Sequence, residues 1–240
     1  RLFYEDLVDP VGLIKGNLDT RLSKYWPYVL SDSKVDMDSK TAEIYSDLMR
    51  ISQKLVAEET LKLISLANVS NLLDVGGGTG AFIEEVGKKW PKIRFCLFDL
   101  PDVVSKAQKI SKARDDSIKV NFVGGSFLSD DLPKCYQVVS LIRVLYDHND
   151  DVVLKLLQKV FAALPSGGKL IISEPMSGGK KSIRSGDSYF GFYTMAMTTG
   201  RPRSPGEHKN LLLRAGFTNI KKQKGTKQFI TQVITAEKKS

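Results

Sequence analysis

The hydrophobic positions of the chain follow two different spacings. From Ser39 to Leu66 they recur at steps of three or four residues, which predicts a helix. After Asn68, short apolar runs alternate with segments of helical spacing. The runs are Leu72–Val75, Phe95–Phe98, Ile118–Phe122, Val138–Ile142 and Leu170–Ser173, and the expected helices are Ala81–Trp90, Val103–Ala113 and Asp151–Leu164. This alternation indicates strand–helix–strand units around a mostly parallel sheet.

The two ends of the chain depart from this alternation. Residues 1 to about 30 show no regular spacing, and we expect an irregular segment there. Near the other end, a predicted helix at Glu207–Ala215 precedes two strand-like runs, Thr218–Gln223 and Phe229–Ala236. Because only a short segment with Gly225 separates these runs, we expect an antiparallel hairpin at the sheet edge. The pattern as a whole therefore predicts an α/β fold whose mostly parallel sheet ends in a hairpin.

Composition narrows the class of protein. With 42% hydrophobic and 26% charged residues among 240, the chain is expected to fold around a sizeable core. It contains no run of roughly 18 apolar residues that could span a bilayer, and its first ten residues do not resemble a signal peptide. Cys96 and Cys135 form no disulfide framework, so a cytoplasmic location is expected. Because the chain starts at Arg1, we treat it as a piece of a longer protein.

The net charge of +9 brings nucleic acids and anionic membranes into consideration. The lysines are scattered, however, and no arginine-rich arm or zinc-finger spacing accompanies them. We therefore expect a solvated basic face and no nucleic-acid partner, with weak peripheral association with the inner membrane as the alternative. His148 and His208 are far apart and no carboxylate cluster has ligand spacing, so no metal site is expected.

A glycine-rich loop follows the first predicted strand. Asp74 is followed by the sequence Val-Gly-Gly-Gly-Thr-Gly, and Asp99 ends the next strand 19 residues after Gly80. Such glycines allow a tight turn and close approach of a ligand, and the second carboxylate can accept hydrogen bonds from ribose hydroxyls. The spacing also satisfies the dinucleotide fingerprint, so an NAD-dependent oxidoreductase is a rival. Asp74 favours S-adenosylmethionine, because a carboxylate suits a cationic methionine end better than a pyrophosphate.

The residues Asp74–Gly80, together with Phe98–Pro101 and Arg214–Phe217, resemble the small-molecule O-methyltransferases of plants and bacteria. The resemblance covers about residues 40–240. It implies a Rossmann-like class I fold that uses S-adenosylmethionine, with seven strands and a reversed final strand behind a helical segment. It also implies that residues 1–38 are the remnant of an N-terminal dimerisation region with its linker and that residues 39–240 form the catalytic domain. The protein would be a homodimer through an N-terminal domain that is missing from this chain.

The same resemblance assigns residues to the cofactor. Asp74 and the loop glycines would hold the methionine part, and Asp99 would hold the ribose. At the adenine side, Ser126 stands where the family commonly has an aspartate, so it offers a weaker hydrogen bond. The complete set expected to bind the cofactor is Asp74, Gly76, Gly78, Gly80, Asp99, Leu100, Ser126, Phe127 and Arg143.

Three further segments narrow the acceptor. Arg143–His148, Ser173–Gly179 and Gly186–Tyr193 resemble the hydroxyneurosporene (demethylspheroidene) type of O-methyltransferase, which methylates the hydroxyl of acyclic carotenoids. Aromatic and methionine side chains suit a long apolar polyene, although an ordinary core helix would also contain them. The residues expected to bind the substrate are Met176, Tyr189, Phe190, Tyr193 and Met197.

The expected catalytic residues depart from the wider family. Its usual His-Asp-Trp motif corresponds here to Tyr146, Asp147 and His148, so tyrosine replaces the usual base. Methyl transfer depends largely on alignment, but the hydroxyl proton must still leave, and His148 has a pKa range suited to that task. Glu174 matches a carboxylate that assists the base, whereas the family's second acid is replaced by Pro202.

Other readings stay open at this point. His208, on the predicted late helix, is expected to be a solvated surface residue. The acceptor could be another small hydroxylated metabolite, such as a phenol or a polyketide. A nucleic-acid methyltransferase and a binding protein that has lost its base are further alternatives.

Overall fold

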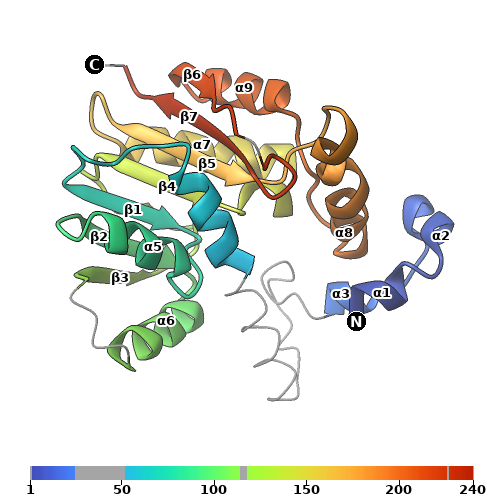
Figure 1. Cartoon of the computed structure of the whole chain (residues 1–240). Helices are drawn as coiled ribbons and strands as arrows, with labels where there is room; N and C mark the ends of the chain where they lie inside the picture. The colour runs from blue at the N-terminus through green and yellow to red at the C-terminus, as the bar shows by residue number, and fades with distance from the viewer. Residues whose placement is uncertain (1, 25–51, 114–117, 226, 240) are drawn as a thin grey trace.

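A seven-stranded sheet forms the centre of the protein in the computed structural model, which describes residues 2–24, 52–113, 118–225 and 227–239 (Figure 1). The strand order is β3-β2-β1-β4-β5-β7-β6. The strands are β1 (Asn71–Val75), β2 (Arg94–Asp99), β3 (Val120–Gly124), β4 (Val138–Ile142), β5 (Lys169–Glu174), β6 (Thr218–Lys222) and β7 (Gln232–Glu237). The predicted α/β fold with seven strands is thereby confirmed.

The first five strands are parallel, whereas β7 runs antiparallel to both of its neighbours. The closing hairpin is confirmed, and β7 inserts between β5 and β6, so β6 is the hairpin strand that lies at the sheet edge. The strand predicted at Ile118–Phe122 begins two residues later, at Val120, and ends at Gly124, which pairs with Asp99.

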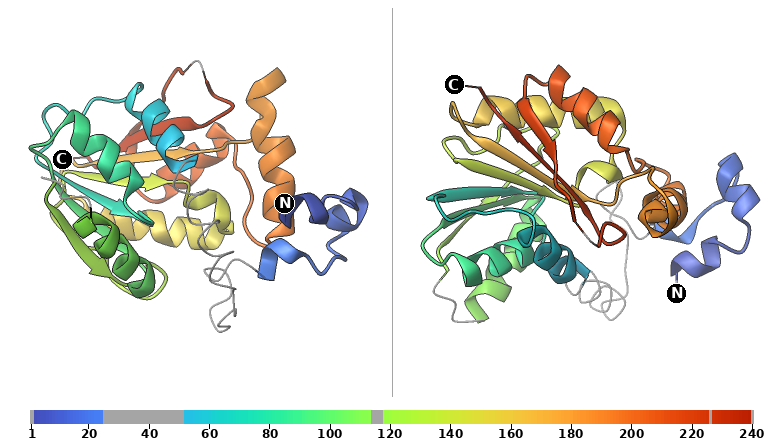
Figure 2. Two further views of the ribbon diagram at one scale, coloured as in Figure 1. Left: turned by 60° about the horizontal axis from the view of Figure 1, so that its bottom comes forward. Right: turned by 45° about the horizontal axis from the view of Figure 1, so that its top comes forward.

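Helices cover both faces of this sheet (Figures 1 and 2). The helix of residues 52–61, α5 (Ala81–Lys89) and α6 (Pro101–Ala113) share one hydrophobic core with the sheet. On the other face, α7 (Asp150–Ala163) and α9 (Pro205–Arg214) share the second core. Strand alternation separates the cores: in β4, Val139 and Leu141 face α7 and α9, whereas Val138 and Ile142 face the other layer.

Short helical turns follow β4 and β5. A 3₁₀ turn, η1 (Leu145–Asp147), follows β4, and another, η2 (Lys181–Arg184), lies beyond β5. A π-helical turn, η3 (Gly186–Phe190), then continues into α8 (Gly191–Ala196).

The expectation of an irregular N-terminal segment was wrong for residues 2–24, which form α1 (Leu2–Asp6), α2 (Pro10–Lys15) and α3 (Arg21–Lys24). Each helix is too short to show a period, and caps stabilise the group. The Asp6 carboxylate accepts hydrogen bonds from the backbone N–H groups of Arg21 and Leu22. These helices pack against α8. The expected domain boundary near residue 38 and the helix start at Ser39 lie outside the described residues.

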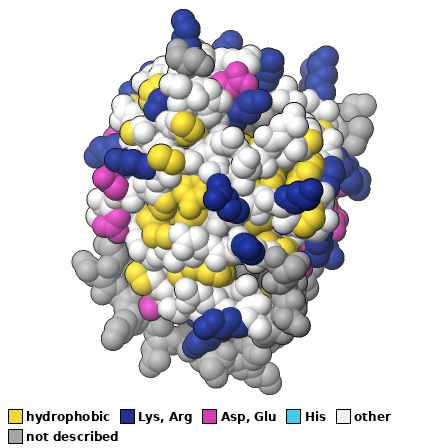
Figure 3. Space-filling model, turned by 90° about the vertical axis from the view of Figure 1, so that its left-hand side faces the viewer, with side chains coloured by type: hydrophobic (Ala, Val, Ile, Leu, Met, Phe, Trp, Pro, Cys, Tyr) yellow, Lys and Arg dark blue, Asp and Glu magenta, His cyan; other side chains and the backbone are white. Residues whose placement is uncertain are grey.

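Basic side chains are dispersed over one end of the molecule rather than gathered into one patch (Figure 3). Uncharged and apolar surface separates them in this view. Within the described residues, no helix has the length and apolar character needed to cross a bilayer.

Candidate active site

Three glycines shape the loop that joins β1 to α5. Gly76, Gly78 and Gly80 have φ values of 69°, 57° and 85°, a left-handed region that disfavours other residues. A side chain at Gly76 would also collide with Val144, whereas a Cβ at Gly78 would meet nothing within 4 Å. The loop therefore presents open backbone at Gly78, where a ligand can approach closely.

Asp74 lies in β1 beneath this loop. It is almost fully buried, and its Oδ1 accepts a hydrogen bond of 2.5 Å from the Ser140 hydroxyl. Its Oδ2 has no hydrogen-bond partner among the described residues. Burial raises the pKa of Asp74 to about 7, with the Ser140 hydrogen bond opposing and the nearby Asp99 adding to the shift. A cation bound at the loop would compensate this buried charge.

Asp99, at the end of β2, connects the loop to the next turn. Its Oδ2 accepts the Gly78 N–H at 2.8 Å, and its Oδ1 accepts the Leu100 N–H at 2.7 Å. Burial raises the pKa of Asp99 although both hydrogen bonds lower it. Asp74, the loop glycines, Asp99 and Leu100 thus come together at the carboxyl ends of β1 and β2, as expected for a crevice that binds a nucleoside.

His148 belongs to this side of the site. Its ring meets that of Phe127 edge to face, with centroids 5.2 Å apart, and Ser126 precedes Phe127 in the loop after β3. Burial lowers the pKa of His148, and Arg203 lowers it further while Glu174 acts in the opposite direction. A neutral imidazole next to Phe127 can accept a proton or contact a planar ligand.

Tyr146 faces a different group of side chains. It is 1% exposed, and its hydroxyl accepts a hydrogen bond of 3.3 Å from Arg143. Its ring lies 5.9 Å from Phe190 and 6.4 Å from Tyr193, centroid to centroid. Burial raises the pKa of Tyr146 well above its usual value, so the phenol stays protonated. Although Tyr146 and His148 are neighbours in sequence, their side chains contact opposite parts of the site.

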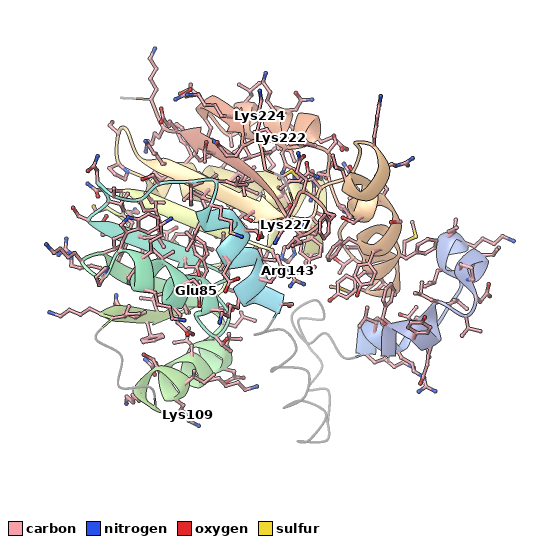
Figure 4. The ribbon with its side chains drawn as sticks, in the orientation of Figure 1. Glu85, Lys109, Arg143, Lys222, Lys224 and Lys227 are labelled. Atoms are coloured by element: carbon pink, nitrogen blue, oxygen red, sulfur yellow. The ribbon has the colours of Figure 1, made fainter. Side chains whose placement is uncertain are left out.

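Arg143 lies next to Tyr146. It has a φ of 58°, uncommon for a residue with a side chain, at the carboxyl end of β4. Its Nη1 donates to the Ser52 hydroxyl at 2.9 Å, so it also connects the sheet to the helix of residues 52–61. Figure 4 shows Arg143 beyond the strand ends, between that helix and α8. Arg143 therefore fixes the Tyr146 hydroxyl relative to the helix of residues 52–61.

Asp147 completes the predicted motif. It is 8% exposed, and its Oδ1 has no hydrogen-bond partner among the described residues. Burial raises the pKa of Asp147 well above its usual value, against the effect of Arg143, and Glu174 adds to the rise. A buried carboxylate of this kind is a stronger proton acceptor than an exposed one.

Glu174 lies behind η1 and next to His208. The prediction that His208 lies on the surface is wrong. The Glu174 Oε2 accepts the Leu145 N–H at 2.9 Å, and its Oε1 lies 3.1 Å from Nε2 of His208. His208 was expected on the surface, but both of these side chains are fully buried. The reason is helical spacing: His208 shares the inner face of α9 with Leu211 and Leu212.

The predicted substrate residues separate into two groups. Tyr189 is 55% exposed, and its ring contacts that of Phe190 edge to face. Phe190 in turn contacts Tyr193 edge to face. Phe3 of α1, which sequence reasoning missed, meets the rings of Tyr189 and Tyr193 at 5.4 and 5.7 Å. We call Phe3, Tyr189, Phe190, Tyr193 and Tyr146 the aromatic row.

The two predicted methionines, Met176 and Met197, are buried, unlike the exposed end of the aromatic row. Met197 is buried in the cluster that contains Tyr146 and Tyr193, whereas Met176 packs into the core below α7 and α9. Arg203 was also missed by sequence reasoning, because a loop residue carries no periodic signal, yet it is fully buried next to η1. Within the described ranges, no group of three or more histidine, cysteine or acidic side chains is arranged to hold a metal ion.

Comparison with known proteins agrees with this geometry. The chain is 49% identical to demethylspheroidene O-methyltransferase of Rhodobacter capsulatus over 99% of its length and 43% identical to that of Cereibacter sphaeroides over 100%. It spans 58% and 63% of the lengths of these two curated relatives.

Solved structures show the same fold. Human N-acetylserotonin methyltransferase in complex with SAM superposes with a TM-score of 0.82 at 20% identity, covering all of this chain and 68% of that one. The structure titled LaPhzM superposes with a TM-score of 0.83 at 19% identity, covering 99% and 70%. A sequence profile of the O-methyltransferase domain matches residues 6–218. The chain therefore belongs to the O-methyltransferase family.

Proposed function

We propose that this chain is the catalytic part of an enzyme that transfers a methyl group from S-adenosylmethionine to the hydroxyl of an acyclic hydroxycarotenoid. The observation that carries the choice of acceptor is the 49% identity, over 99% of the chain, to a demethylspheroidene O-methyltransferase. The aromatic row supports it, because aromatic rings offer large apolar surfaces that can pack against a long polyene.

The residues present fit S-adenosylmethionine. Among the described residues, one buried carboxylate oxygen of Asp74 has no hydrogen-bond partner beneath the glycine loop, where a cation would compensate its charge. Asp99 offers its carboxylate to ribose hydroxyls at the adjacent strand end, and Phe127 offers a ring surface for the adenine. When bound, this cofactor supplies an electrophilic methyl group. The chain's own task is to align an acceptor oxygen with that group and to remove a proton.

In the proposed mechanism, Tyr146 orients the acceptor. Its phenol stays protonated, so it donates a hydrogen bond to the acceptor oxygen while Arg143 fixes its position. Two groups are able to take the hydroxyl proton: the neutral imidazole of His148 and the buried Oδ1 of Asp147, which has no hydrogen-bond partner in the part of the chain that the structure describes. Glu174 contacts the backbone behind η1, which supports a role in holding η1 rather than in touching the acceptor.

Labelled-methyl transfer to a 1-hydroxylated acyclic carotenoid tests this proposal, with products separated by chromatography and identified by mass spectrometry. A methoxy product is expected from the wild type and from Lys109→Ala, an exposed change on α6 remote from the site (Figure 4). Loss of product in Asp147→Asn but not in His148→Ala would assign the base to Asp147, and the reverse would assign it to His148. A wild type that binds the cofactor but methylates only phenols would refute the carotenoid assignment, and stabilisation by NAD instead would refute the class.

We also propose that the chain acts as a homodimer in the cytoplasm. The support is a set of exposed apolar side chains on or beside α1 and α2, namely Tyr4, Val8, Val11 and Ile14. Light scattering after size exclusion is expected to give a dimer mass that falls when Val8 and Ile14 are changed to serine. A mass that does not change would refute this surface. Sedimentation with anionic vesicles tests the weaker proposal of peripheral membrane association.

A further inference from the structure

One loop holds the backbone of the segment that contains the proposed reactive residues. Thr199 donates through its Oγ1 to the carbonyl of Asp147 at 3.0 Å. Arg203 donates through Nη1 to the carbonyl of Leu145 at 2.8 Å and through Nη2 to that of His148 at 2.7 Å. Three of the four carbonyls of residues 145–148 are thus bound by side chains from residues 199–203.

The fourth carbonyl contacts the loop backbone itself. Gly200 has a φ of 69°, and a Cβ there would lie 2.7 Å from the His148 nitrogen and closer still to the Tyr146 carbonyl oxygen. Only glycine allows the two backbones to approach so closely. The loop and η1 therefore pack backbone against backbone at Gly200.

Arg203 is itself fixed by an ion pair with Asp150. Its side chain is 0% exposed, and its Nε and Nη2 lie 2.8 and 2.7 Å from Oδ1 of Asp150 at the start of α7. The Leu145 N–H is bound in turn by the buried carboxylate of Glu174. The backbone N–H of Leu145 therefore contacts the buried Glu174 side chain, and its carbonyl contacts the buried Arg203 side chain. Such buried charges cost desolvation, which their hydrogen bonds must offset.

Arg201 provides an internal comparison. It binds the same Asp150 carboxylate at 2.9 Å and also pairs with Glu207, but its side chain is 45% exposed. Among the hydrogen bonds found for its side chain, none reaches residues 145–148. Both arginines therefore pair with Asp150, whereas the hydrogen bond to η1 comes from Arg203.

We propose that Arg203 is a positioning residue for methyl transfer: through the carbonyls on either side of Tyr146 and Asp147, it fixes the acceptor-side phenol relative to the cofactor-side His148. This inference rests on the proposed function. Because the guanidinium is planar and reaches several acceptors at once, lysine keeps the charge but cannot make the same set of bonds. A small displacement of η1 would then misalign the acceptor oxygen while leaving the glycine loop unchanged.

The test compares Arg203→Lys with the matched control Arg201→Lys. We expect Arg203→Lys to lower kcat about 10- to 100-fold with little change in cofactor Kd, and Arg201→Lys to behave as wild type. In a Tyr146→Phe background, the Arg203→Lys effect is expected to shrink. The reason is that Arg203 is proposed to act by positioning the Tyr146 hydroxyl, which this background lacks. An effect of the same size in both backgrounds, or wild-type kcat in folded Arg203→Lys, would overturn the proposal.

Two further measurements keep the test decisive. Hydrogen exchange at the amides of residues 145–148 is expected to quicken in Arg203→Lys and not in Arg201→Lys. This readout needs no turnover, so failure of the proposed function, seen as a wild type without product, remains distinguishable. If Arg203→Lys does not fold by circular dichroism, Thr199→Val removes one bond of the same contact. It should show the same pattern to a smaller degree, and unchanged exchange and kcat in that variant would overturn the proposal.

Discussion

Asp74 shows how a single buried carboxylate links stability to ligand binding. Its folded-state pKa of about 7 lies above the value of 3.8 expected for an unfolded aspartate. The folded protein therefore keeps a proton that the unfolded chain releases, and stability is lost as pH rises from about 4 to about 7. A shift of that size corresponds to roughly 4 kcal/mol. The ligand-free protein thus bears a cost at neutral pH that a bound cation removes.

Replacing Asp74 with asparagine should remove this pH dependence. The amide oxygen can still accept the Ser140 hydrogen bond, but no charge develops. Urea unfolding should show that Asp74→Asn gains stability relative to wild type between pH 4 and pH 8, by a few kcal/mol at most. Cofactor affinity should fall in the same variant. An exposed change, Asp102→Asn, serves as control, and a stability difference that stays constant with pH would contradict the assignment.

Sequence reasoning succeeded where a residue follows a strand end or a fixed spacing. Asp74, the loop glycines and Asp99 were predicted together because their positions are set by the strand–turn–helix pattern, and the structure places them side by side. His208 failed because a polar side chain on an inner helix face is not distinguished from a solvated one by its chemistry alone. The spacing of His208 with Leu211 and Leu212 was the signal that could have revealed it. For Arg203 the sequence offers no comparable signal, since its partners are backbone carbonyls 55 and 58 residues away.

At the scale of elements, the β1–α5 turn depends on backbone freedom rather than on side chains. Gly78 and Gly16 both adopt left-handed conformations with φ values of 57° and 68°, and a Cβ at either would meet nothing within 4 Å. Gly16 ends α2, far along the chain from the cofactor loop. The two positions therefore share the same local strain and differ in their distance from the proposed ligand.

Alanine at these positions should separate strain from binding. Both Gly78→Ala and Gly16→Ala are expected to cost about 1–2 kcal/mol of stability, the usual penalty for a left-handed residue with a Cβ. Only Gly78→Ala should weaken cofactor binding strongly, because its methyl group occupies the open side of the loop. Calorimetric titration with S-adenosylmethionine measures the cofactor affinity of each variant. Equal cofactor affinities in the two variants would show that the loop does not approach the ligand at Gly78.

Elements of regular spacing were predicted well, and short elements were not. The alternation of the strands shows within a few residues, and α5, α6, α7 and α9 have enough residues for a helical period to show. By contrast, α1 to α3 contain five, six and four residues. Their stability comes from contacts across the chain, such as the Thr20 hydroxyl donating to the Ala196 carbonyl. A pattern within four to six residues cannot report contacts of that range.

The whole molecule divides the site between two structural sources. The proposed cofactor side lies at the ends of β1 and β2, while the proposed acceptor side lies at α8 and the N-terminal helices. Leu22 of α3 is 3% exposed in the cluster that also contains Tyr146 and Tyr193. The packing of α3 is therefore expected to affect one half of the site only.

Leu22→Ala tests this division. The lost packing should cost about 2–5 kcal/mol locally and raise KM for the acceptor, with cofactor Kd unchanged. Steady-state kinetics with each substrate varied in turn would show the effect. Leu213→Ala, an exposed change on α9, provides the comparison and should alter neither constant. A parallel loss of cofactor affinity in Leu22→Ala would mean that the two halves are coupled.

The position of β7 has a consequence for the order in which the protein can be completed during synthesis. β5 is paired with β4 on one side and with β7 on the other, yet β7 is made about 60 residues after β5. Until residues 232–237 leave the ribosome, β5 keeps an open edge whose backbone groups can pair with another chain. Glu174, at the end of β5, supports η1 from that same strand. The nascent chain is therefore most exposed to aggregation late in translation, and the cofactor side of the site is complete before β5 acquires its last neighbour.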